Sequence, residues 1–152
     1  MLSPMIWLGL VALGALAIAS IRRIPEGQVY TLRRFGGHTR VMHSGMHLML
    51  PLLERVAHKI SLTGANVPVD GLVAADQRYR GVVYFQVLDP ERADRVIDRV
   101  DGLLQERTRS LFADASLPDT SDSRRQWLKQ SLNSDVRERG LLVTRVDLNA
   151  VA

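Results

Sequence analysis

The sequence has 152 residues, a formal net charge of +4 at pH 7 and no cysteine. The absence of cysteine excludes a disulfide framework, a thiol nucleophile and cysteine-ligated zinc. Aromatic residues make up only 5% of the chain and are not interleaved with the basic ones, so the composition favours lipid over nucleic acid as a partner.

The N-terminal segment carries no charge before Arg22 and Arg23. About 20 apolar residues in a helix cross the hydrocarbon core of a bilayer, and Leu2–Ile21 has that length and composition. We therefore predict a transmembrane anchor over residues 1–21. The residues expected to contact lipid acyl chains are Leu2, Trp7, Leu10, Leu13, Leu16 and Ile21.

Two alternatives remain for this segment. Ala17-Ile18-Ala19 resembles a signal-peptide cleavage site, which would release a soluble binding domain outside the cytoplasm, although a signal peptide begins with a basic region that is missing here. A helix buried inside the domain is the second alternative.

If the segment is a retained anchor, the arginines that follow it predict that the rest of the chain lies in the cytoplasm, by the positive-inside rule.

Charge is unevenly distributed along the chain. Residues 22–59 contain seven arginines and lysines against two acidic residues, a net charge of +5. Residues 60–152 contain thirteen against fourteen, a net charge of −1. Because anionic headgroups attract basic side chains by about 1 kcal/mol each near the surface, the segment after the anchor is expected to face the bilayer.

The segment from residue 22 to residue 88 reads mainly as strands. Pro25-Glu26-Gly27 is expected to end the anchor helix, and Gly36-Gly37 is expected to form a hairpin turn. Met46–Leu53 is an apolar loop between two strands. The predicted strands are Gln28–Phe35, His38–His43, Arg55–Leu62, Val67–Ala75 and Tyr79–Leu88.

Residues 89–139 are predicted to be mainly helical. A helix begins at Asp89-Pro90 and ends near Gly102, a second segment continues to Phe112, and a third helix covers residues 124–139 up to Gly140. A closing strand over residues 141–150 completes an α+β domain with an antiparallel sheet and helices packed on it.

Three ordered motifs carry a family resemblance. They are Pro25-Glu26-Gly27 through Arg34-Phe35-Gly36, Ser44-Gly45-Met46-His47 through Val56, and Val83–Val87 followed by Asp89-Pro90. Behind an N-terminal anchor, this order resembles the SPFH or Band 7 family of stomatin and prohibitin relatives, and is most similar to short bacterial stomatin-like proteins. The likeness covers residues 1–150, and the segment between Leu62 and Gly81 is shorter than is usual in the family.

The resemblance implies a non-catalytic, membrane-anchored scaffold that organises a membrane patch and modulates a membrane-bound protease or channel. It also implies homo-oligomers, or hetero-oligomers with SPFH paralogues, and no cofactor. Stomatin-like proteins continue into a long coiled coil, and because the sequence contains no heptad run of that length, we expect an SPFH domain over residues 22–150 without one.

Two sets of contact residues are predicted. Residues for contact with the membrane surface are Arg22, Arg23, Arg40, Met46, Leu48, Leu50, Leu52, Arg55 and Lys59. Residues on helix faces for association with a partner or a second copy are Val96, Ile97, Val100, Trp127, Leu128 and Leu132.

Catalytic chemistry finds little support in the sequence. His38, His43 and His47 lie within ten residues of one another, but no carboxylate lies between Glu26 and Glu54 to complete a metal site. No nucleophile elbow or phosphate-binding loop is present. We therefore expect no catalytic, cofactor or metal residues, and a histidine-dependent metal enzyme is the least favoured alternative.

Overall fold

The computed structural model describes residues 4–34, 36–49, 54–74, 77–113 and 117–151. They fall into two compact units, Met1–Lys59 and Ile60–Ala152. Helices and antiparallel strands occur together, which confirms the predicted α+β class. The domain predicted over residues 22–150 extends across both units.

The first unit begins with helix α1, Pro4–Ser20, which passes directly into strand β1, Ile21–Ile24. The predicted anchor included Ile21, but the helix ends one residue earlier. The Ser20 hydroxyl donates to the Leu16 carbonyl oxygen at 2.7 Å, and the Ser20 carbonyl oxygen accepts from the Met49 backbone N–H at 2.8 Å. The helix end is therefore held by a backbone contact from Met49 and has no connecting loop.

Strand β1 forms a two-stranded ribbon with β4, Gly45–Leu48. The pairing is antiparallel, with Ile21 opposite Leu48 and Ile24 opposite Gly45. We predicted the start of this apolar stretch, at Met46, as part of a loop, so the assignment was wrong for residues 46–48. Pro25-Glu26-Gly27 was expected to end the anchor helix, but strand β1 lies between the helix and this turn.

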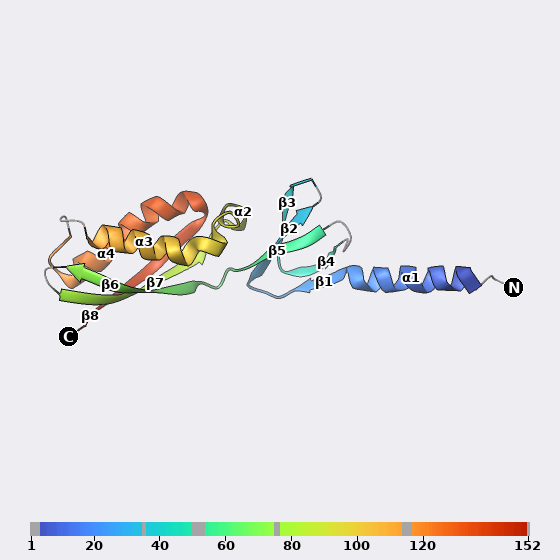
Figure 1. Cartoon of the computed structure of the whole chain (residues 1–152), viewed down its shortest axis with the longest axis horizontal. Coiled ribbons are helices and arrows are strands. Elements are labelled where there is room, and N and C mark those ends of the chain that lie inside the picture. Colours follow the sequence, from blue (N-terminus) through green and yellow to red (C-terminus); the bar gives the residue numbers. More distant parts are fainter. Residues whose placement is uncertain (1–3, 35, 50–53, 75–76, 114–116, 152) are drawn as a thin grey trace. The chain divides into compact units, whose positions relative to one another are not determined.

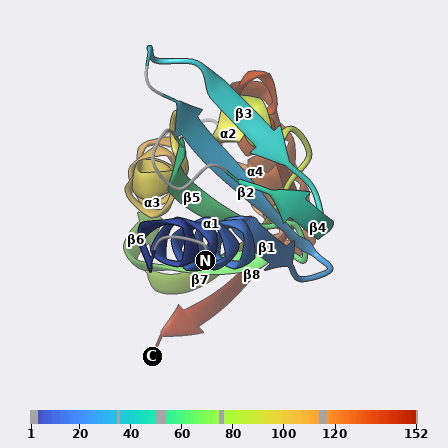
Figure 2. The same ribbon diagram turned by 90° about the vertical axis from the view of Figure 1, so that its right-hand side faces the viewer.

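A second sheet of the first unit has the strand order β3-β2-β5. Its strands are β2, Gln28–Arg34, β3, Thr39–Met42, and β5, Glu54–Ser61, close to their predicted bounds. Figure 2 shows β2 and β3 side by side as a hairpin. A small core lies beneath them, made by Ile24, Leu32, Met42 and Met49.

The second unit is a three-stranded antiparallel sheet covered on one face by two helices (Figure 1). The strands are β6, Ala65–Ala74, β7, Gln77–Val87, and β8, Leu141–Val151, with β7 in the centre. The covering helices are α3, Val100–Phe112, and α4, Ser121–Val136. Their buried residues pack against the sheet in one hydrophobic core, which includes Leu104, Phe112, Leu128, Leu132, Val136, Val83, Val143 and Leu148.

The segment between β7 and α3 differs from the prediction. Asp89 caps the helix as expected, accepting from the backbone N–H groups of Glu91 and Arg92, but α2 spans only Pro90–Ala93. A 3₁₀ turn, η1, covers Ile97–Arg99, and α3 then begins at Val100 and includes Gly102. Gly102 therefore does not end a helix; a side chain there would meet no atom within 4 Å, which fits an exposed first turn.

Helix side chains close both edges of this sheet. Along β6, Gln105 and Arg109 of α3 donate to the carbonyl oxygens of Pro68 and Asp70 at 3.0 and 3.2 Å. Along β8, Asn133 of α4 donates to the Val143 carbonyl oxygen at 3.0 Å and accepts from its N–H at 2.8 Å. Such contacts satisfy edge groups that would otherwise invite another strand.

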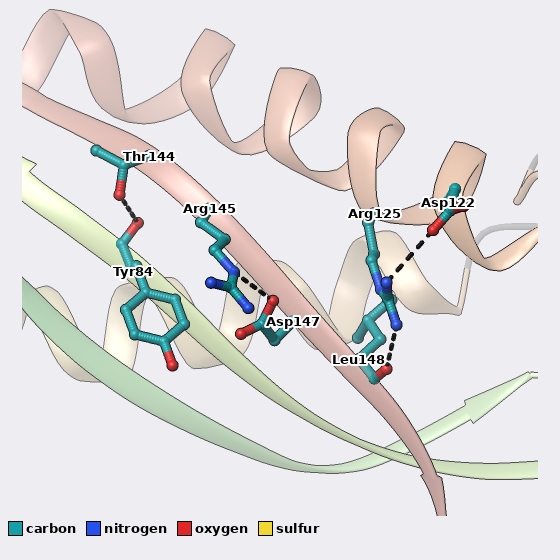
Figure 3. Close-up of polar contacts among 7 residues, drawn as sticks. All are labelled: Tyr84, Asp122, Arg125, Thr144, Arg145, Asp147 and Leu148. Carbon is teal, nitrogen blue, oxygen red and sulfur yellow. Dashed lines mark hydrogen bonds and ion pairs between the residues drawn. The ribbon is translucent and has the colours of Figure 1, made fainter.

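Arg125 extends the closure of the β8 edge. One of its terminal nitrogens donates to the Leu148 carbonyl oxygen at 3.0 Å, and the other contacts Asp122 at 3.3 Å (Figure 3). Helix α4 thus binds the outer side of β8 at two places, about two turns of helix apart.

Gly140 joins the end of the helical segment to β8. It follows the 3₁₀ turn η2, Arg137–Arg139, with a left-handed φ of 76°. Its carbonyl oxygen accepts from the N–H groups of Leu88 at 2.8 Å and Asp89 at 3.1 Å. A Cβ at this position would overlap the Asp89 carbonyl oxygen, so the site requires glycine.

We predict that Gly140→Ala lowers the free energy of unfolding by about 2–5 kcal/mol, because it combines left-handed strain with a backbone clash. Gly71→Ala is the matched control: Gly71 has a φ of 77°, and a Cβ added there would meet no atom within 4 Å. It should lose only about 1–2 kcal/mol from the strain. Urea unfolding followed by circular dichroism measures both; equal losses would show that the clash contributes nothing.

We predict that Asn133→Ala lowers the free energy of unfolding by about 1–3 kcal/mol, because both backbone groups of Val143 lose their partner. Gln130→Ala removes an exposed amide one turn earlier on α4 and should change stability by less than about 0.5 kcal/mol. Thermal unfolding of the two variants makes the comparison, and similar midpoints would contradict a role for Asn133 at the edge.

Candidate functional site

Helix α1 exposes apolar side chains around its whole circumference. Every residue from Pro4 to Ala19 is exposed, including Trp7 at 61%, Leu13 at 68% and Ile18 at 76%. Leu10 and Leu16, also predicted to contact lipid, are exposed as well. A soluble protein rarely exposes so large a continuous apolar surface, which marks a site for lipid or for another protein.

The predicted complete membrane crossing is not confirmed. Among the residues that the structure describes, no helix combines the length and the apolar character needed to cross a membrane. Leu2, the first residue predicted to contact lipid, lies outside the described residues.

The β1–β4 ribbon continues the apolar surface of α1. Ile21 is opposite Leu48, and Arg23 is opposite Met46. Residues opposite each other, and residues two apart, share one face of an antiparallel pair, so these four side chains lie on the same side of the ribbon. Ile21, Met46 and Leu48 are 55%, 78% and 70% exposed. We call these four residues the ribbon face.

The remaining predicted membrane-surface residues are spread over several strands. Arg22 lies opposite His47, on the other side of the ribbon. Arg40 is exposed on β3, and Arg55 and Lys59 are exposed on β5, where the Lys59 ammonium lies 5.4 Å from the centre of the Tyr30 ring. Leu50 and Leu52 lie outside the described residues.

The predicted partner-binding residues lie in or against the core of the second unit. Val100, Leu128 and Leu132 are at most 5% exposed. Val96, Ile97 and Trp127 are partly buried and pack against the same core. Because Val100, Leu128 and Leu132 cover the sheet, they have no surface to offer a partner in this structure.

Charged groups of the second unit form local ion pairs. The Asp147 carboxylate accepts from Arg145 Nε at 2.6 Å and raises the pKa of that guanidinium (Figure 3). Asp135 on α4 raises the pKa of Arg107 on α3 in the same way, through a hydrogen bond and its charge. Both shifts keep the arginines charged, so neither pair supplies acid–base chemistry; the Arg107–Asp135 pair joins α3 to α4, whereas Arg145 and Asp147 both lie on β8.

The histidines do not form a metal site in the described part of the chain. His47 Nε2 donates to the His43 carbonyl oxygen at 2.8 Å, a contact between residues four apart. No group of three or more histidine, aspartate or glutamate side chains among the described residues could hold a metal ion.

Sequence reasoning did not find how β1 places Ile21 and Arg23 beside Met46 and Leu48. Strand β1 has only four residues, with two adjacent arginines between two isoleucines, so it shows no alternation that would reveal it. It also missed the buried Glu54, which lies with Arg34 and His38 around a hollow on the β2–β3 hairpin. The side chains around this hollow come from separate strands, so their spacing in sequence gave no signal.

An exposed apolar helix joined to an amphipathic ribbon and an α+β unit is typical of a membrane-associated domain. The family described as SPFH domain / Band 7 family matches residues 22–152, so the chain belongs to that family. The predicted resemblance is thereby confirmed. Members of the family are generally membrane-associated, non-catalytic scaffolds, and they typically form oligomers.

Individual relatives are similar at modest identity. Human stomatin-like protein 2, mitochondrial, is 26% identical over 122 residues, which cover 74% of this chain and 33% of that protein. An uncharacterised protein of Mycobacterium tuberculosis is 28% identical over 162 residues, covering 94% of this chain and 42% of that protein. The chain therefore spans about a third of the length of the first relatives and less than half of the second.

Proposed function

We propose that this chain is a membrane-attached, non-catalytic scaffold, in which α1 inserts into the bilayer and the ribbon face rests in the lipid interface. The observation that carries the proposal is the continuous exposed apolar surface of α1, Ile21, Met46 and Leu48, with Arg23 among them. Membership of a family of membrane-associated scaffolds supports it.

The junction at Ser20 supports the proposal that α1 and the ribbon act together. Since β1 begins at the residue after α1, and Met49 bonds the last helical carbonyl, the ribbon cannot swing freely from the helix. Insertion of α1 would then bring Met46 and Leu48 to the acyl boundary. Arg23, on the same face, would lie at headgroup level, where a guanidinium can contact phosphate while its stem stays in apolar surroundings.

The finer parts of the function follow from the family and from charge. We propose a single crossing with the second unit in the cytoplasm, because Arg22, Arg23, Arg33, Arg34 and Arg40 follow the helix. There the second unit would assemble with further copies or with SPFH paralogues, organise a membrane patch, and modulate a membrane-bound protease or channel.

Attachment through α1 is tested with Leu10→Lys and Leu13→Lys in the full chain. Two charges near the centre of the helix disfavour insertion by about 5–7 kcal/mol, more than a thousandfold. The variant should leave the membrane pellet on alkaline carbonate extraction, whereas the wild type and the control with Leu10→Ile and Leu13→Ile remain. A double-lysine variant that stays in the pellet would contradict attachment through α1.

Contact by the ribbon face is tested with a fluorophore, because the sequence has no cysteine and accepts a single introduced one. In vesicles of phosphatidylcholine and phosphatidylglycerol, an environment-sensitive label on Met46→Cys should emit at shorter wavelength than in detergent-free buffer. The same label on Gln126→Cys, exposed on α4, should remain in water. Identical spectra for the two labels in vesicles would exclude ribbon insertion while leaving attachment through α1 intact.

Orientation is tested by fusing a reporter that is active only in the cytoplasm after residue 152. We expect activity, since the basic residues follow the helix. A silent fusion, together with N-terminal sequencing that finds the mature chain beginning after Ala19, would instead favour the secreted binding domain.

A further inference from the structure

The β2–β3 hairpin carries a hollow of about 440 Å³ lined by Leu32, Arg34, His38, Arg40 and Glu54. Leu32 and Arg40 are cross-strand partners, and the backbone N–H of Arg34 donates to the His38 carbonyl oxygen at 3.0 Å across the turn. Because residues two apart on a strand share a face, Arg34, His38 and Arg40 lie on the face that also carries buried Leu32.

Burial and charge differ sharply within this hollow. Glu54, at the start of β5, is only 6% exposed. Arg34, His38 and Arg40 are exposed. Glu54 takes part in polar interactions within the structure. The residues that line the hollow include two guanidiniums and one carboxylate, so the two arginines alone leave positive charge in excess.

This arrangement is unlike the arginine–aspartate pairs of the second unit. There Arg80 pairs with Asp70, and Arg145 pairs with Asp147, one cation to one anion. In the hollow a single buried carboxylate can orient the guanidiniums without neutralising both. Two guanidiniums that line one hollow suit a phosphate group, which they bind through paired, charge-assisted hydrogen bonds.

We propose that the hollow formed by Arg34, His38 and Arg40 over Glu54 binds a phosphate group, carried either by a lipid headgroup or by a free phosphorylated small molecule. In this site Arg34 and Arg40 donate to the phosphate oxygens, His38 supplies a third donor, and Glu54 orients the guanidiniums from below. The site lies on the β2–β3–β5 sheet and is separate from the ribbon face.

The test uses the full chain in uncharged detergent micelles, with an environment-sensitive fluorophore on Thr39→Cys. Thr39 is exposed and lies between His38 and Arg40 in the sequence, so its side chain is on the other face of the hairpin. The label therefore reports on the hairpin without occupying the hollow. Inorganic phosphate is titrated at ionic strength held constant with sodium chloride. Micelles keep the measurement independent of where α1 and the ribbon lie in a bilayer, so failure of the proposed function would not affect it.

Matched variants separate this site from general basic charge. Arg34→Gln and Arg40→Gln should each weaken phosphate binding about tenfold or more, because each removes charge-assisted hydrogen bonds. Arg33→Gln is the control: it makes the same change at the neighbouring exposed position, opposite Thr39 on the other face of the hairpin, and should leave binding unchanged. Thermal unfolding verifies that each variant is folded.

Glu54→Gln is expected to change the affinity for phosphate in the opposite direction to the arginine variants. It keeps the side-chain shape and an oxygen that can still accept from the guanidiniums and orient them, but it removes the negative charge that competes with phosphate, so phosphate binding should become several-fold tighter. If Arg34 and Arg40 served only to pair with Glu54, this variant would be destabilised without any gain in phosphate binding, which would count against the proposal.

The source of the phosphate is distinguished in nanodiscs of phosphatidylcholine with or without phosphatidic acid. A fluorescence change caused by phosphatidic acid and lost in Arg34→Gln assigns the site to a lipid headgroup. A change caused by inorganic phosphate alone assigns it to a free ligand. No response to either probe, or equal losses in Arg33→Gln and Arg34→Gln, would overturn the proposal.

Discussion

The close backbone contact at Gly140 is the constraint on which the second unit depends. Its carbonyl oxygen receives the N–H groups of Leu88 and Asp89, just after β7 and at the cap of α2, while β8 begins at the next residue. One glycine therefore fixes where the central strand ends, where the helical segment starts and where the last strand enters the sheet. A Cβ would overlap the Asp89 carbonyl oxygen, so no other residue permits this approach.

The helical segment leaves and rejoins the sheet at one point, and the buried side chains of its helices hold them on one face. Helices α3 and α4 bury that face and also complete the outer edges of β6 and β8 through Gln105 and Asn133. The buried residues of these helices are then committed to the fold. Any lateral contact by the second unit must use other surfaces, such as the opposite sheet face around Tyr84 and Arg145 (Figure 3).

The sequence predicted best where one periodicity covered a whole element. Strand β7 and helix α4 show clear period-2 and period-3.6 patterns, and both lie close to their predicted bounds. The predictions from the sequence failed where tertiary contacts determine the bounds of an element. Ile21 leaves an apolar helix for a strand because Met49 bonds Ser20, and Val100 starts a new helix through Gly102. The candidate site was also predicted only in part. Met46 and Leu48 were predicted from their hydrophobicity, whereas their pairing with Ile21 and Arg23 depends on strand register.

Charge separates the roles of the two units. In the second unit, net −1, arginines lie against nearby aspartates, as in Arg107–Asp135 and Arg145–Asp147, so their fields largely cancel within a Debye length of about 8 Å. The first unit, net +5, holds Arg23 beside exposed apolar side chains and Arg34 and Arg40 around one buried carboxylate. Attraction to anionic surfaces therefore originates in the first unit, which also carries the apolar helix. Under the proposed function, this division leaves the locally neutralised second unit for contacts with other proteins.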